Sequence, residues 1–296
     1  MSDTPERSGL ARSIDQLFTT GRSARDDEPP TGGNGAVEAE GSAMLHPAVP
    51  LVAALGRERD DDRRHAIVDE LARLGEPAAD SIADALAQTE DRFARSVYLD
   101  ALISLAPVSL KVVEEMMDDP RWFVVRNGSF VLGEIGSPRA VELLVGGLAR
   151  PEPKVRREAV LALAKAGGVD ASQLVFGMLD DPATTVRVAA VSAVGALGVE
   201  RAVKPLMRML DQEDDPDLLL AALHALGHLG DPAAVRAIEH HAVGSFLRRP
   251  PRDLRIAAYG ALRHIGTPHA RRLLNQAVDD RDPAVKAEVR RLLGMA

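Results

Sequence analysis

The sequence predicts an all-α protein, a right-handed solenoid of about eight helix pairs. Three observations support this prediction. One phrase recurs about every 31 residues from Met44 onward. Each copy holds two stretches whose apolar residues have helical spacing, and no stretch of useful length alternates as a half-buried strand does. Self-similarity at this period is typical of stacked supersecondary units.

The recurring phrase is clearest over Asp180–Gly198, which reads DDPATTVRVAAVSAVGALG. An acidic-Pro turn precedes Val-Arg, and an apolar helix then ends in Leu-Gly. Asp suits the N-cap of a helix, Pro its first turn, and Gly its left-handed C-cap. In successive copies the Arg position falls on Arg64, Arg95, Val125, Arg156, Arg187, Leu219, Arg255 and Lys286.

The phrase and its turn residues predict where each helix begins and ends. We expect the first helices of the pairs near residues 46–56, 77–88, 108–117, 138–149, 171–179, 200–210, 232–246 and 268–278. We expect the second helices near residues 62–74, 92–105, 121–135, 153–166, 183–197, 216–229, 252–265 and 283–294. The predicted repeat solenoid therefore occupies residues 44–296.

Residues 1–43 differ in composition and form a predicted tail. Residues 21–43 are rich in Gly, Pro, Ser and charge, so burial cannot offset their ordering entropy and we expect a disordered linker. Residues 5–20 predict a short amphipathic helix, whose apolar stripe is made by Leu10, Ile14, Leu17 and Phe18. One interpretation is that this helix docks on a partner. The alternative is that it folds back on the solenoid or forms only transiently.

Composition excludes several classes of protein. Aromatic residues make up only 3% of the chain, and small aliphatic residues suit closely stacked helices. The absence of cysteine excludes disulfides, Cys-ligated metals and thiol nucleophiles. A net charge of −8 argues against a general nucleic-acid binder. Because no apolar signal core and no run of ~18–20 apolar residues occurs, we expect a cytoplasmic protein without a membrane span.

The consensus D-P-x-x-V-R-x-x-A-x-x-A-L-G-x-x-G resembles HEAT repeats, and its short, Ala-rich form is similar to the bilin-lyase-type (PBS lyase) HEAT-like repeat. The resemblance covers roughly residues 46–294. It implies a structural ladder of acidic and basic residues through the turns. The predicted ladder residues are Arg64, Arg95, Arg156, Asp181, Arg187, Arg255, Asp282 and Lys286. A row of phosphate-binding arginines is the alternative, against which the neighbouring acidic residues argue.

Nothing in the sequence predicts a catalytic, cofactor or metal site. Deoxyhypusine hydroxylase, a HEAT-like metal enzyme, is recognised by repeated His-Glu pairs, and none occurs here; Glu239 precedes His240 instead. His224 and His228 have a spacing that can chelate a metal, and His264 has the register of His228 one copy later, but a site needs a further ligand. An enzyme or enzyme subunit, either bilin-lyase-like or a metal oxidoreductase, remains the alternative to a non-catalytic protein.

The first candidate partner-binding surface is a strip on the second helix of the third pair. Trp122, Arg126, Phe130 and Glu134 follow one another at four-residue steps, so they share one helix face. Trp122 is the one tryptophan of the chain, and aromatic residues with arginine are typical of binding hot spots. The alternative is that Trp122 packs in the core.

The second candidate is a basic loop over 244–256, where one repeat step lengthens to 36 residues. Its candidate binding residues are Phe246, Arg248, Arg249 and Arg252. An acidic protein segment or a phosphate group would suit them; the alternative is a solvated loop without a binding role. Nucleic-acid binding through the basic C-terminal third is a further alternative for the function of the chain. The sequence thus predicts a non-catalytic protein-interaction scaffold or adaptor of a prokaryotic cytoplasm, with no cofactor and a partner that it does not identify.

Overall fold

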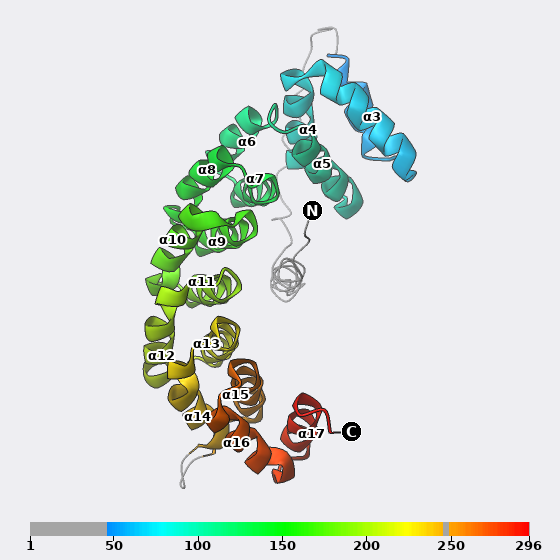
Figure 1. Ribbon diagram of the computed structural model, residues 1–296. Helices are drawn as coiled ribbons and strands as arrows, with labels where there is room; N and C mark the ends of the chain where they lie inside the picture. The colour runs from blue at the N-terminus through cyan, green and yellow to red at the C-terminus, as the bar shows by residue number, and fades with distance from the viewer. Residues whose placement is uncertain (1–45, 245–248, 296) are drawn as a thin grey trace, which may run out of the picture. The chain divides into compact units, whose positions relative to one another are not determined.

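A computed structural model describes residues 46–244 and 249–295. Within these ranges the chain forms sixteen α-helices and no strand, which confirms the predicted helical solenoid of eight helix pairs. The chain divides after Ala166 into two compact units. Each unit contains four helix pairs and is described by itself (Figure 1).

The first unit, residues 46–166, consists of four pairs. The first helices are α2 (Ala48–Leu55), α4 (Glu76–Gln88), α6 (Leu110–Met117) and α8 (Pro138–Leu148). The second helices are α3 (Asp61–Leu74), α5 (Arg92–Ser104), α7 (Trp122–Ile135) and α9 (Pro153–Ala166). In this unit α4, α6 and α8 follow one another on one side, and α5, α7 and α9 follow one another on the other (Figure 1).

The second unit, residues 167–295, repeats this arrangement. Its first helices are α10 (Gly168–Gly177), α12 (Val203–Gln212), α14 (Val235–Val243) and α16 (Pro268–Gln276). Its second helices are α11 (Thr184–Ala196), α13 (Pro216–Leu229), α15 (Arg252–Ile265) and α17 (Pro283–Leu292). Short 3-10 turns adjoin the first helices at Met178–Asp180, Glu200–Ala202, Pro232–Ala234 and Ala277–Asp279.

Side-chain caps set the starts of several helices, as the turn residues predict. Asp91 accepts a hydrogen bond from the main-chain N–H of Phe93 (2.9 Å) at the start of α5. Asp282 accepts one from Ala284 (3.0 Å) at the start of α17. Each bond satisfies one of the N–H groups that the first turn of a helix leaves without a partner.

Glycine–alanine contacts bring consecutive second helices close together. A Cβ added at Gly133 of α7 would lie 2.9 Å from the Cα of Ala162 in α9. The same construction at Gly227 of α13 gives 2.8 Å to the Cα of Ala261 in α15. Because backbones approach this closely, small residues fill the interface between second helices. This packing explains how a chain with few aromatic residues builds a core.

Three predictions of the sequence lie outside the described residues, namely the linker, the short helix near 5–20, and the side chains of Phe246 and Arg248. The prediction of one repeat array over 44–296 stays a prediction, because the two units are described separately. Across 46–244 and 249–295, every helix is too short or too polar to cross a membrane.

Candidate interaction sites

The recurring arginine of the phrase bonds to the main chain of its own turn. In four copies its guanidinium donates a hydrogen bond to the carbonyl oxygen six residues earlier. These bonds run from Arg64 to Glu58 (3.4 Å), Arg95 to Thr89 (3.1 Å), Arg156 to Arg150 (2.8 Å) and Arg187 to Asp181 (3.2 Å). The arginine therefore satisfies a main-chain carbonyl of the turn that follows the first helix of its pair.

Both acidic residues of the predicted ladder, Asp181 and Asp282, accept a hydrogen bond from the main-chain N–H two residues later. The Asp181 carboxylate accepts from the N–H of Ala183 (2.8 Å), while Arg187 reaches the Asp181 carbonyl rather than that acceptor oxygen. In the last copy Lys286 pairs with Asp279 (3.0 Å). The sequence places these residues in the turns, but it does not reveal that the arginine recognises a carbonyl, because that contact depends on the path of the main chain.

The predicted strip lies along α7. Trp122 is partly exposed, and two cations approach its ring: Arg126, 5.4 Å from the ring centroid, and Lys154 of α9, at 5.2 Å. Farther along the helix Phe130 is partly exposed, and Glu134 pairs with Lys165 of α9 at 3.6 Å. Trp122 is thus neither a core residue nor fully exposed. The ring lies between cations, an arrangement that favours aromatic–cation attraction.

A pocket of about 180 Å³ opens beside the strip, within the first unit. Its walls are the end of α4 with the turn that follows it (86–90), Arg95 from α5, and Trp122, Phe123, Arg126 and Asn127 from α7. The two aromatic rings meet edge to face, with their centroids 6.3 Å apart. The pocket therefore has an aromatic wall next to guanidinium and amide groups.

Two polar side chains of this pocket have groups left over for a ligand. Asn127 is 5% exposed, and its amide makes no hydrogen bond within the described part of the chain. Arg95 bonds to the Thr89 carbonyl and has no carboxylate partner among the same residues. The amide nitrogen and oxygen of Asn127 are not among the fully buried side-chain atoms that lack a partner, so they reach the pocket surface and can bond to a ligand.

Sequence analysis did not single out Asn127 or Arg95 as pocket residues. The available signal was Asn127 itself, a polar residue at the place in the phrase that Ala189, Ala221 and Ala257 hold in other copies. Nothing in the sequence distinguishes Arg95 as a pocket residue, because it is the arginine that the recurring phrase has at this position. Its contribution to the pocket depends on how α5 packs beside α7.

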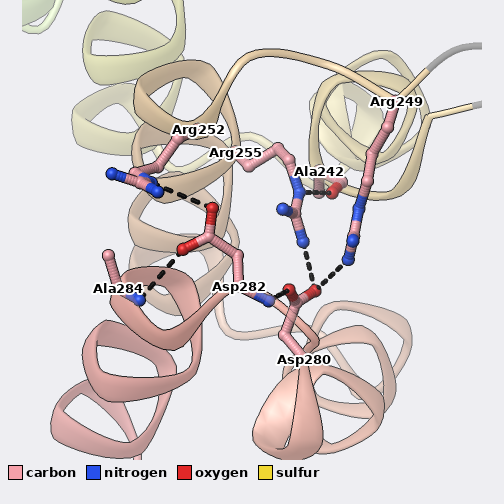
Figure 2. Close-up of polar contacts among 7 residues, drawn as sticks. All are labelled: Ala242, Arg249, Arg252, Arg255, Asp280, Asp282 and Ala284. Carbon is pink, nitrogen blue, oxygen red and sulfur yellow. Dashed lines mark hydrogen bonds and ion pairs between the residues drawn. The ribbon is translucent and has the colours of Figure 1, made fainter.

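The described part of the basic loop forms an ion-pair cluster with the last helix pair (Figure 2). Asp280 pairs with Arg255 and, at 2.6 Å, with Arg249. Asp282 pairs with Arg252 at 2.9 Å. The Arg255 side chain is only 3% exposed, so its charge needs a buried partner. The predicted binding residues Arg249 and Arg252 thus already have carboxylate partners in this unit.

Three of the six histidines of the second unit lie on α13 and α15. The rings of His228 and His264 lie 5.7 Å apart, and Nδ1 of His228 is 2.9 Å from the His224 carbonyl oxygen. Loss of hydration lowers the pKa of His224 and of His264, and the charge of His228 lowers both further. In the described ranges no three His, Asp or Glu side chains are placed to hold a metal ion.

Comparison with known families matches residues 129–187 and 177–245 to the family described as HEAT repeats. Together these stretches include the whole of α8, α9, α10, α11, α12, α13 and α14. Comparison with curated proteins finds no match.

Solved structures give further likenesses of fold. Human deoxyhypusine hydroxylase in complex with glycerol is 21% identical, with 74% of this chain and 96% of that chain covered and a TM-score of 0.37. The complex of CpcE and CpcF of phycocyanin lyase from Nostoc sp. PCC7120 is 21% identical, with 88% and 100% covered and a TM-score of 0.40. A designed armadillo repeat protein in complex with the peptide (KR)4 is 16% identical, with 83% and 98% covered and a TM-score of 0.38. No activity or partner transfers to this chain at these levels of likeness.

Proposed function

We propose that this chain, a HEAT-repeat protein, is a non-catalytic scaffold or adaptor that binds another protein in a prokaryotic cytoplasm. Repeat solenoids bury each unit against its neighbours and leave long helix faces for partners. Function then depends on what those faces display. The faces formed by the second helices are the proposed binding surface.

One observation carries the proposal: the pocket beside Trp122, with the Asn127 side chain in its wall. Aromatic and arginine side chains around a partly enclosed hollow are typical of the anchor points where binding energy concentrates. The strip of Trp122, Arg126, Phe130 and Glu134 extends this surface along α7. By contrast, Arg249 and Arg252 are engaged by Asp280 and Asp282, so we give the basic loop a secondary role.

Affinity capture with chemical crosslinking from extracts of the source organism tests the scaffold function. We expect the full chain to retain a defined set of proteins, and Trp122→Ala to lose them. Phe176→Ala is the matched control, because Phe176 is also a partly exposed ring under a guanidinium, that of Arg201 at 4.2 Å. Retention of no protein above the bead background, or equal loss with both variants, would reject a scaffold that works through this surface.

The tail over 1–43 is the second proposed contributor. A chain that lacks these residues should lose part of the retained set if the predicted helix near 5–20 docks on a partner. If the shortened and full chains retain the same proteins, the helix has no docking role.

A further inference from the structure

We propose that the pocket beside Trp122 binds the C-terminal residue of a partner protein, with the apolar side chain against the aromatic wall and the free carboxylate on Arg95 and Asn127. This inference rests on the proposed scaffold function and specifies the partner's chemistry.

The volume fits one amino-acid side chain. A cavity of ~150 Å³ in a protein accepts a benzene molecule, whereas sites for drug-sized ligands enclose ~300–1,000 Å³. At about 180 Å³ the pocket has room for a side chain of leucine or phenylalanine size and little more. Trp122 and Phe123 provide the apolar contact for that side chain.

The polar groups call for an acceptor with two oxygens. Arg95 retains donors beyond the one that bonds to Thr89, and it lacks a carboxylate partner within the described ranges. The Asn127 amide supplies further N–H donors at the pocket wall, on a residue that is 5% exposed. Guanidinium groups bind carboxylates in a planar, paired geometry, and such bonds are stronger than neutral ones. A carboxylate in the pocket would offer oxygen acceptors to the donors of both side chains, which line the same wall.

A C-terminal residue carries the apolar group and the carboxylate on one Cα, which matches a pocket of one-residue size. A free amino acid would also bring an ammonium group. That charge would lie near the two cations Arg95 and Arg126, which outnumber the one carboxylate of the wall, Glu90, so net repulsion disfavours it. A chain terminus lacks this ammonium group, because its nitrogen belongs to a peptide bond.

The chain's one tryptophan gives a direct test, because its fluorescence reports on the pocket itself. The full-length protein is titrated with acetyl-Gly-Ala-Leu as the free acid, with the same peptide as its C-terminal amide, and with free leucine. We expect saturable binding of the acid, and weaker binding of the amide by roughly 10-fold or more, since a hydrogen bond to a charged group contributes about 1.5–3 kcal/mol. Free leucine should bind more weakly than the acid peptide.

Equal binding of acid and amide, or no binding of either, overturns the carboxylate assignment. Tighter binding of free leucine overturns the assignment to a chain terminus. Arg95→Lys should weaken binding of the acid peptide, whereas Arg64→Lys should leave its binding unchanged. Arg64 makes the same bond to the carbonyl six residues earlier but stands outside the pocket, so it controls for the structural role of Arg95. If Arg95→Lys does not fold, the comparison of acid and amide on the unaltered chain still decides.

The two proposals fail in different ways. One outcome is that proteins are retained through Trp122 but the acid and amide peptides bind equally. This outcome supports the scaffold function and rules out a C-terminal residue as the ligand of the pocket. A selective effect of the carboxylate without any protein retained through Trp122 would support the pocket chemistry and reject the scaffold function.

Discussion

Arg150 donates a hydrogen bond from its guanidinium to the main-chain carbonyl of Asp119, at 2.8 Å, and so replaces an arginine that the third helix pair lacks. In four other copies the recurring arginine bonds to the carbonyl six residues before it. In the third copy that position is Val125, which is fully buried, and the carbonyl six residues earlier belongs to Asp119. The bond thus comes from the next turn, 31 residues onward.

We predict that Arg150→Ala destabilises the first unit by about 1–3 kcal/mol, because it leaves this carbonyl without its donor. The midpoint of urea unfolding, followed by Trp122 fluorescence, measures the change. Arg139→Ala is the control: its side chain is 51% exposed and pairs with Glu114 and Glu142, so its loss should move the midpoint little. A midpoint for Arg150→Ala that equals the control would show that the bond contributes nothing.

The sequence predicts much of the fold because each turn has its own local signal. Asp, Pro and Gly mark the helix ends, and the observed bounds of α13 and α15, Pro216–Leu229 and Arg252–Ile265, coincide with the predicted ones. The repeat also identifies Val125 as an exception. It does not identify Arg150 as the replacement, because that bond depends on how one turn lies over the next.

The candidate site is less predictable from sequence, for the same reason. Trp122 is conspicuous because it is the one tryptophan, whereas the pocket also needs the end of α4 and Arg95 of α5. The charge excess around Arg249 is visible in the sequence. Its partner Asp280 stands 31 residues later, in the following turn, so only the stacking of repeats brings the pair together.

We predict opposite effects for two glycine-to-alanine substitutions in the second unit. Gly227→Ala should destabilise the second unit by about 1–3 kcal/mol through overpacking, because the added Cβ would lie 2.8 Å from the Cα of Ala261. A backbone atom cannot move away from this contact as the end of a flexible side chain can. Gly260 of α15 has open space around the same added atom. Gly260→Ala should therefore stabilise by up to about 1 kcal/mol through helix propensity. Urea midpoints of the two variants check this, and equal shifts would contradict the close-packing argument.

We predict that Asp280→Asn destabilises the second unit by on the order of 3 kcal/mol, because it leaves the buried guanidinium of Arg255 without a counter-charge. Asp279→Asn provides the control one residue away. Asp279 is 79% exposed and pairs with Lys286 and Arg290, so its neutralisation should change the thermal midpoint only slightly. Far-ultraviolet circular dichroism during heating compares the variants. If Asp280→Asn leaves the thermal midpoint unchanged, then groups other than the Asp280 carboxylate stabilise the charges of Arg249 and Arg255.

The histidines on α13 and α15 predict a loss of stability in mild acid. Loss of hydration holds the pKa of His224 and His264 below the ordinary value, with the charge of His228 as a further cause and, for His264, that of Arg263. The unfolded chain, whose histidines titrate near ~6.5, then binds more protons than the folded protein below that pH. Stability from these groups is therefore complete above pH ~6.5 and declines as the pH falls below it.

The measurement is the urea midpoint at pH 7.5 and at pH 5.5 for the unaltered chain and for His224→Gln with His264→Gln. The double variant should lose less stability between these two conditions, because glutamine does not titrate. The carboxylates elsewhere in the chain are common to both proteins, so the difference between them isolates the two histidines. An equal loss in both proteins would mean that protons bind His224 and His264 as readily in the folded protein as in the unfolded chain.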